Sequence, residues 1–335
     1  MQKFLIIQTA FIGDVVLATG LIEKLHAFFP DAAIDFLVRK GNESLLTGHP
    51  YLREVLVWDK KGGKIKDLRR LLHLIRQERY DKVINVQRFT ATGMLTAFSR
   101  AAETIGFDKN PLSRLFTVTV KHRVSTNAAV LHEIERNNQL IAHFTDAKAF
   151  KPRLYPSAKD FAAVQTYKAG PYICVAPSSV WFTKQFPAEK WTAFIQQLPE
   201  NYAVYLLGAP SDKQLCDGII TASNRPRVFN LCGQLSFLQS AALMKDARMN
   251  YVNDSAPMHF ASSVNAAVTA VYCSTVPYFG FGPVSDNSHI VETLLPLACR
   301  PCGLHGRKAC PLGHFNCAHS IREEQLLQTL DVAAQ

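Results

Sequence analysis

Three loops contain the polar side chains best suited to chemistry, and each follows a stretch expected to be a buried strand. The first is Thr9 to Asp14, after the apolar run Phe4 to Ile7, and it ends in Gly13 and Asp14. A carboxylate there can act as a general base that takes a proton from an attacking hydroxyl. Aspartate is also a favoured N-cap, so Asp14 could instead cap the helix expected from Val15 to Phe29. Residue type alone favours capping.

The second loop combines small hydroxyl residues with one lysine. It follows the strand expected from Tyr172 to Ala176 and contains Ser178, Ser179, Thr183 and Lys184. Hydroxyl groups donate hydrogen bonds and lysine supplies positive charge, so this combination suits a phosphate. The loop is not a Walker A motif, and serine and threonine also fill ordinary loops.

The third loop follows the strand expected from Met249 to Asn253 and opens a helix with Asp254, Ser255, Ala256 and His259. The N–H groups and the dipole at a helix start attract anions. Capping by the aspartate or the serine, and a packed histidine on the helix face, explain the same residues equally well. The single glycine of the first loop does not match G-x-G-x-x-G, which disfavours a nicotinamide dehydrogenase.

Strands and helices alternate along most of the chain, which indicates an α/β fold with parallel sheets. A length of 335 residues favours two domains. The proline-containing stretch Lys151 to Pro156 is the expected linker, giving domains 1–155 and 156–335. Helices are expected over Asn127 to His143 and Ile321 to Val332. The remaining expected strands are Ile34 to Val38, Val55 to Trp58, Val83 to Val86, Ala203 to Leu207 and Ala267 to Tyr272.

The composition is that of an ordinary globular protein, with 48% hydrophobic and 19% charged residues. The short apolar start does not resemble a signal peptide and no stretch is long enough to cross a membrane, so we expect a cytoplasmic protein. The net charge is +10, and cations cluster at Lys60, Lys61, Lys64, Lys66, Arg69, Arg70, Arg76, Arg79, Lys82 and Arg88. Such a run is either the solvated face of a helix or a surface for membrane lipid, nucleic acid or an acidic substrate.

Eight cysteines fall into two groups. Those in apolar segments, namely Cys174, Cys216, Cys232 and Cys273, are expected to be packed thiols. The other group, Cys299, Cys302, Cys310 and Cys317, has enough thiolates for a tetrahedral structural zinc site. A reducing cytoplasm favours zinc over disulfides, while free or redox-active thiols remain an alternative.

Together the loops resemble glycosyltransferase family nine, the ADP-heptose:lipopolysaccharide heptosyltransferases, over nearly the whole chain. The segments that carry the resemblance are Gly13 to Thr19, Ala176 to Ser179 followed by Thr183 to Pro187, Leu231 to Ser236 and Asp254 to His259. The order and spacing of these segments are far more specific than any one of them.

The resemblance implies a GT-B fold, in which two Rossmann-like domains turn their parallel sheets toward a central cleft. It implies that residues 1–155 bind a lipid-linked saccharide acceptor, with Thr9 and Gly13 in the acceptor-side loop, and that residues 156–335 bind the nucleotide sugar. The resemblance also implies that the transfer inverts the anomeric carbon and needs no catalytic metal or other cofactor. It implies no nucleic-acid partner. The enzyme would work in the cytoplasm, in peripheral contact with the anionic inner face of the membrane.

Individual roles follow from the same resemblance. Asp14 matches the family's proposed base and Lys184 its lysine near the donor phosphates. The residues expected at the donor are Ser178, Ser179, Thr183, Lys184, Asp212, Asp254, Ser255, Ala256 and His259. The chain departs from the family pattern at Ala256, where glycine is usual, and at Asp212, which matches only approximately an acidic residue at the nucleotide ribose.

Two other interpretations stay open. A family relative could use another nucleotide sugar, or the chain could be a GT-B epimerase. A degenerate transferase could also serve as a non-catalytic anion-binding or zinc-dependent interaction module. The joint presence of Asp14, Lys184, Asp254 and His259 disfavours the latter.

Overall fold

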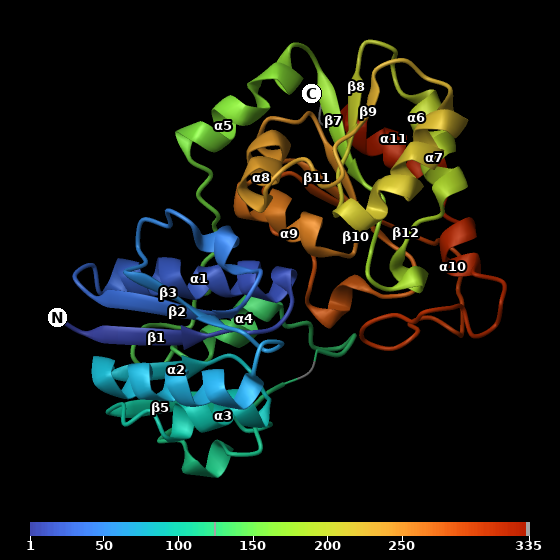
Figure 1. Cartoon of the computed structure of the whole chain (residues 1–335). Coiled ribbons are helices and arrows are strands. Elements are labelled where there is room, and N and C mark those ends of the chain that lie inside the picture. The colour runs from blue at the N-terminus through green and yellow to red at the C-terminus, as the bar shows by residue number, and fades with distance from the viewer. Residues whose placement is uncertain (124, 333–335) are drawn as a thin grey trace. The chain divides into compact units, whose positions relative to one another are not determined.

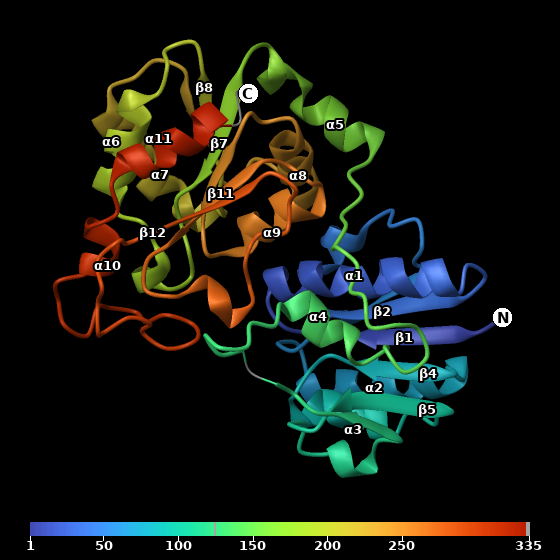
Figure 2. The ribbon, with the colours of Figure 1, turned by 180° about the vertical axis from the view of Figure 1, so that it is seen from behind.

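The computed structural model describes residues 1–123 and 125–332 and divides the chain into two compact units, Met1–Tyr155 and Pro156–Gln335. Each unit is a parallel sheet covered by helices on both faces (Figures 1 and 2). None of the helices in the described ranges combines the length and apolar character needed to cross a bilayer.

The sheet of unit 1 has six parallel strands in the order β3-β2-β1-β4-β5-β6. Its central strands are almost fully buried apolar runs, as expected for a sheet covered on both faces. The strands are β1 (Lys3–Ile7), β2 (Ala33–Arg39), β3 (Glu54–Trp58), β4 (Lys82–Asn85), β5 (Glu103–Phe107) and β6 (Val118–Val120).

The helices of unit 1 pack in two pairs, α1 with α4 and α2 with α3, on opposite faces of the sheet (Figure 2). Helix α2 buries Leu71 and Ile75 and turns its Lys and Arg side chains to solvent, which explains its amphipathic sequence. The helices are α1 (Ile12–Phe28), α2 (Lys64–Glu78), α3 (Thr90–Ala97) and α4 (Glu133–Asn138), with 3₁₀ turns η1 (Glu43–Leu46) and η2 (Ser113–Leu115).

Unit 2 repeats this topology, because its sheet order is β12-β11-β10-β7-β8-β9. Counted from its own first strand, that is the same sequence of crossovers as in unit 1. The strands are β7 (Tyr172–Ala176), β8 (Ala203–Leu206), β9 (Val228–Asn230), β10 (Asn250–Asn253), β11 (Val268–Tyr272) and β12 (Ser288–Glu292).

The core of unit 2 joins the sheet to α6, α7 and the C-terminal helix α11, while α5, α8 and α9 pack beside one another on the other face (Figure 1). Leu326 and Leu330 of α11 lie in the same apolar cluster as Trp191, Phe194 and Tyr251. The helices are α5 (Ala158–Val164), α6 (Ala188–Gln197), α7 (Lys213–Ser223), α8 (Phe237–Lys245), α9 (Ala256–Ser263), α10 (Asn316–His319) and α11 (Glu323–Val332). The 3₁₀ turns are η3 (Gln165–Lys168), η4 (Phe182–Lys184), η5 (Pro210–Asp212) and η6 (Pro277–Phe279).

Each sheet reverses its strand order at one place, between β1 and β4 in unit 1 and between β7 and β10 in unit 2. Loops at the carboxyl ends of two such strands diverge and leave room for a ligand. The Thr9 to Asp14 loop follows β1, the Ser178 loop follows β7 and the Asp254 loop follows β10. All three loops selected from the sequence therefore lie at the switch point of their own sheet.

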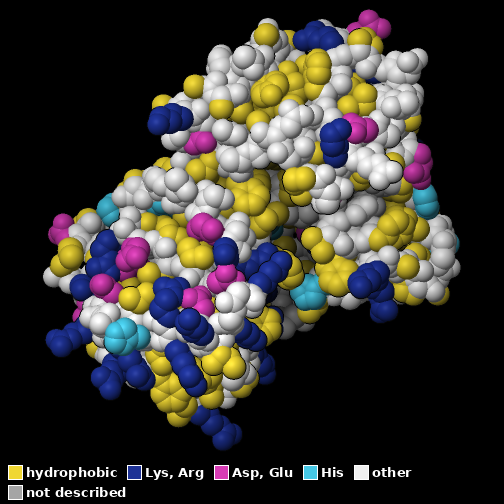
Figure 3. Space-filling view, viewed as in Figure 1, with side chains coloured by type: hydrophobic (Ala, Val, Ile, Leu, Met, Phe, Trp, Pro, Cys, Tyr) yellow, Lys and Arg dark blue, Asp and Glu magenta, His cyan; other side chains and the backbone are white. Residues whose placement is uncertain are grey.

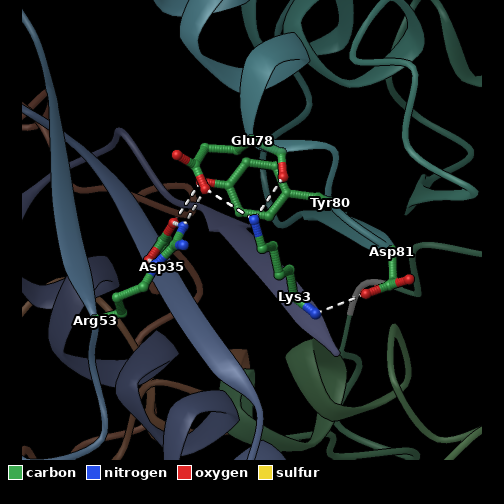
Figure 4. Close-up of polar contacts among 6 residues, drawn as sticks. All are labelled: Lys3, Asp35, Arg53, Glu78, Tyr80 and Asp81. Carbon is green, nitrogen blue, oxygen red and sulfur yellow. Dashed lines mark hydrogen bonds and ion pairs between the residues drawn. The ribbon is translucent and has the colours of Figure 1, made fainter. Parts of the chain in front are cut away.

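Ionic contacts gather at the opposite, amino end of the first sheet (Figure 4). The buried carboxylate of Asp35 accepts hydrogen bonds from Arg53 Nε at 3.0 Å and from the Tyr80 hydroxyl. Arg53 and Lys3 both reach Glu78, with the Arg53 contact at 2.7 Å. Every ion in the cluster has a partner, so we interpret it as a tie between strands β1 to β4 rather than as a ligand site.

The helix expected over Asn127 to His143 is wrong in extent, because only Glu133–Asn138 is α-helical. His132 caps this helix by accepting from Ile134 N, which fixes its start. Before it, the Ser125 hydroxyl donates to Leu131 O and accepts from Leu131 N, so these backbone groups are satisfied outside a helix.

Candidate active site

The loop after β1 is held by polar side chains from three other segments of unit 1. Lys60 Nζ donates to Thr9 O at 2.8 Å and to the Thr9 hydroxyl at 3.2 Å. Asn42 Nδ2 donates to Ala10 O at 3.1 Å, and Gln87 donates to the side chain of Gln8. Thr9 is buried, so its hydroxyl supports the loop rather than a ligand.

Lys60 brings a cation to the same loop. Burial and then the neighbouring cations Arg39 and Lys64 lower the pKa of Lys60. In the sequence this lysine was one member of a long basic run, and nothing distinguished it from its exposed neighbours. In the fold, the Lys60 ammonium lies 4.7 Å from the centre of the Trp58 ring, at the end of β3.

Asp14 is the third residue of α1, since this helix begins at Ile12 with Phe11 as its N-cap residue. The prediction that Asp14 is the N-cap residue of this helix, which residue type favoured, is therefore wrong. Gly13 is the second residue of the helix, and Asp14 is partly exposed in the first turn. A carboxylate there gains from the helix dipole and still borders the loop at the switch point.

Lys184 and Asp254 form an ion pair at the switch point of unit 2. Lys184 Nζ lies 2.7 Å from Asp254 Oδ2, and the two side chains are only 15% and 10% exposed. The lysine ends η4, after β7, and the aspartate follows β10, so the two loops meet across adjacent strands. Charges in this shielded place interact with one another more strongly than charges at the open surface.

Asn253 fixes the two loops to each other. Its side chain accepts from Phe186 N at 2.9 Å and donates to Pro177 O at 2.8 Å. The residue is fully buried at the end of β10, so these bonds satisfy its amide completely on both sides. The backbone that carries Ser178 and Ser179 is therefore held in one conformation.

Asp212 supports Ser178 from the loop after β8. Its Oδ1 accepts from the Ser178 hydroxyl at 2.9 Å and its Oδ2 accepts from Ala209 N at 2.8 Å. A Cβ on Gly208 would come within 2.9 Å of both the Asp212 carboxylate and Cys232 Sγ, so any larger residue here would force these side chains to shift. The structure thus brings Asp212 into contact with the Ser178 loop.

Thr183 is placed differently from its predicted role at the donor. It is 1% exposed, and its hydroxyl accepts from Arg307 N at 2.7 Å and from Ser274 Oγ at 2.9 Å. These bonds tie Thr183 to Ser274, which follows β11, and to Arg307 in the Cys-rich segment. We therefore interpret Thr183 as a support for Lys184.

Helix α9 starts beside the Lys184–Asp254 pair, with Ser255 as N-cap residue and Ala256 as its first residue. Ser255 makes no side-chain capping bond and instead donates to Asn253 O at 3.3 Å. Pro257 at the second position has no N–H, and Met258 N donates to Ser255 O at 3.1 Å, so this helix start offers an anion its dipole rather than a set of open N–H groups. His259 lies one turn further along and is buried.

The eight cysteines are free thiols, and Cys174, Cys216, Cys232 and Cys273 are buried as expected. Burial, then Cys299 and Cys310, raises the pKa of Cys302. Burial and then Cys302 raise the pKa of Cys317 to about 11. Within residues 1–123 and 125–332, no three His, Cys, Asp or Glu side chains are arranged to hold a metal ion, so zinc stays a prediction.

Comparison with known proteins decides the family. A model described as glycosyltransferase family 9 (heptosyltransferase) matches residues 68–311. The chain belongs to this family. It is a glycosyltransferase related to the heptosyltransferases of lipopolysaccharide biosynthesis, as its sequence predicted.

Characterised relatives match at low identity but over most of their length. Lipopolysaccharide heptosyltransferase 2 of Escherichia coli K12 is 23% identical over 88% of both chains. Lipopolysaccharide heptosyltransferase 3 of Escherichia coli is 25% identical over 83% of this chain and 85% of that protein.

Solved structures confirm the fold. Escherichia coli ADP-heptose lipopolysaccharide heptosyltransferase II superposes with a TM-score of 0.81 at 21% identity, covering 99% of this chain and 98% of that one. A family 9 glycosyltransferase from Veillonella parvula gives 0.82 at 20% identity, covering 99% and 97%. The predicted family, glycosyltransferase family nine, is thus confirmed. The predicted GT-B type of fold is confirmed too, with two parallel six-stranded sheets.

Proposed function

We propose that the protein is an inverting, metal-independent heptosyltransferase that moves a heptosyl residue from ADP-heptose to a lipopolysaccharide inner-core acceptor. The observation that carries the proposal is the Lys184–Asp254 pair at the switch point of unit 2, beside the start of α9. A shielded cation and a helix start together suit a nucleoside diphosphate. The names of the relatives supply the class of sugar and acceptor.

In the proposed reaction, the acceptor hydroxyl attacks the anomeric carbon of the donor and loses its proton to the Asp14 carboxylate. The new C–O bond forms as the bond from the anomeric carbon to the diphosphate oxygen breaks, and that electron pair leaves with ADP. One in-line displacement inverts the anomeric centre. Lys184 and the N-terminal dipole of α9 stabilise the charge on the leaving group, so the mechanism requires no metal or other cofactor.

The two units have separate tasks in this proposal. Residues 156–335 bind the donor, with Ser178, Ser179, Lys184 and the Asp254 to His259 segment around the diphosphate. Residues 1–155 bind the acceptor, with the Thr9 to Gly13 loop next to the base. Ala256 carries a methyl group where the family usually has glycine. The methyl group leaves less room for the phosphates at the helix start.

A thermal-shift screen tests the donor. ADP-heptose at about 100 times its dissociation constant is expected to stabilise the folded chain by about 2.7 kcal/mol, because it binds the native state alone. UDP-sugars should shift the melting temperature much less. A larger shift with a UDP-sugar would show that the donor is not ADP-heptose. The absence of a shift with any nucleotide sugar would favour a non-catalytic module.

We also propose a peripheral contact between unit 1 and an anionic membrane, at the cytoplasmic face where a lipid-linked acceptor is presented. Lys64, Lys66 and Arg69 of α2 are exposed, and Ile65 between them is 68% exposed. Figure 3 shows Lys and Arg side chains gathered over this unit, with hydrophobic side chains between them. Such a surface suits acidic lipid headgroups.

Vesicle sedimentation tests this contact. The protein should pellet with vesicles containing phosphatidylglycerol and be released by salt, since exposed charges are screened. Replacing Lys64, Lys66 and Arg69 with glutamine should weaken the binding. Equal binding to neutral vesicles would contradict an electrostatic contact.

We further propose structural zinc at Cys299, Cys302, Cys310 and Cys317. Burial and then the thiols of Cys299 and Cys310 raise the pKa of Cys302, and burial and then Cys302 raise the pKa of Cys317, so these side chains interact with one another. Four thiolates are a donor set that zinc favours. Metal analysis of protein purified without chelator should find one zinc per chain. Protein that is fully folded and free of zinc would exclude it.

A further inference from the structure

We propose that Arg300 is a positioning residue of the donor site, and that it acts together with the rest of segment 300–307 on the Lys184–Asp254 pair. The inference rests on the proposed function, because it assigns a support to the charges that would hold the donor. Arg300 lies in the Cys-rich segment and carries none of the motifs that indicated the site.

The guanidinium of Arg300 fixes the turn that follows β11. Its Nε donates to Cys273 O at 2.7 Å, and its Nη2 donates to Thr275 O at 2.7 Å and Tyr272 O at 3.1 Å. Nη2 also lies 2.6 Å from Glu292 Oε2 at the end of β12. The side chain is 11% exposed, so these bonds are shielded from water and the turn has one defined shape.

That turn carries the hydroxyl that holds Asp254. Thr275 Oγ1 donates to Asp254 Oδ2 at 2.7 Å, and the same oxygen contacts Lys184 Nζ. The neighbouring Ser274 donates from N to Thr183 O at 3.2 Å. Arg300 is therefore linked to the acidic member of the pair through one residue, without touching either charge.

The other end of segment 300–307 holds the basic member. Arg307 N donates to the Thr183 hydroxyl, and Thr183 N donates back to Arg307 O at 3.1 Å. Gly306 has φ +77°, and a Cβ there would come within 2.9 Å of Lys184 Cγ. The backbone of this segment thus lies directly against the stem of Lys184 and limits where its ammonium can go.

One segment consequently fixes both members of the pair. Cys302 N donates to Ser274 O at 2.9 Å and ties the middle of the segment to the same turn. Loss of Arg300 would leave Lys184 and Asp254 present but free to shift. A displacement of about 1 Å at a binding or catalytic group can reduce the rate about 100-fold.

The test compares Arg300→Met with Arg225→Met. Arg225 is a matched control in the same unit, because its guanidinium also binds backbone carbonyls, those of Ile195, Leu198 and Pro199, remote from the switch point. Both variants should lose stability. Calorimetric titration with ADP-heptose should show roughly tenfold weaker binding for Arg300→Met alone.

A double variant then shows through which residues Arg300 acts. In a Lys184→Met background, Arg300→Met should weaken donor binding less than about twofold, because coupled residues are not additive. The full tenfold effect in that background, or equal affinities of Arg300→Met and Arg225→Met, would overturn the proposal. If wild type binds no nucleotide sugar, the proposed function itself fails.

A second pair of variants covers the case in which Arg300→Met does not fold. Thr183→Val removes the hydroxyl that accepts the hydrogen bond from Arg307 N, while Thr183→Ser keeps it. Donor affinity should fall in the valine variant and remain near wild type in the serine variant. Equal affinities in these two variants would contradict a positioning role for the segment.

Discussion

Asp14→Asn is expected to reduce kcat by roughly 100-fold to 10,000-fold, because the amide cannot accept the proton of the attacking hydroxyl. The replacement has nearly the same shape. Asp14 lies in the first turn of α1, and its charge there contributes about 0.3–1 kcal/mol through the helix dipole. The melting temperature and the donor affinity should therefore change little while kcat collapses. Steady-state kinetics with thermal unfolding measures both.

Asp160→Asn is the matched control. Asp160 is likewise the third residue of a helix, α5 in unit 2, where its carboxylate closes a capping box with Ser157. This variant should lose a similar amount of stability and keep its kcat. If Asp14→Asn kept wild-type turnover, the base would have to be another residue.

Lys184→Met is expected to lower kcat/KM by roughly 100-fold to 1,000-fold, the range seen when one stabilising donor of a transition-state charge is removed. It should also cost stability, because the shielded carboxylate of Asp254 loses its cation. Removing one partner of a buried pair costs about 3–5 kcal/mol. Kinetics and denaturant unfolding on one preparation measure the two losses together.

The double variant Lys184→Met with Asp254→Asn separates the two effects. Neutralising the aspartate removes the unpaired charge, so stability should return toward wild type while activity stays low. Lys190→Met is the control, since Lys190 forms a comparably shielded pair with Glu323 at 3.1 Å elsewhere in unit 2. It should lose stability and keep activity. Normal activity in Lys184→Met would refute a role at the donor.

The sequence predicted the positions of the central strands well because they are fully buried and therefore continuously apolar. The strand Tyr172–Ala176 agrees residue for residue, and the loops after β1, β7 and β10 follow from such strands. Edge strands gave a weaker signal. Strand β9 is only Val228–Asn230, and Phe229 within it is 46% exposed, so no apolar run marked it.

The contacts that organise the site could not be predicted from residue type. Asp14 looked like an N-cap because the start of α1 was placed three residues too late, at Val15 rather than Ile12. Thr183 looked like a phosphate ligand because its hydroxyl could equally bind a ligand or a backbone amide. Arg300 and Thr275 reach Asp254 only through the folding of β11, a tertiary contact that leaves no local pattern.

The most direct test of the whole account is mass spectrometry of an inner-core acceptor incubated with the enzyme, ADP-heptose and a metal chelator. The account predicts that the acceptor gains the mass of one heptosyl residue. An acceptor of unchanged mass beside full activity with another nucleotide sugar, or transfer that stops in the presence of the chelator while the protein stays folded, would contradict it.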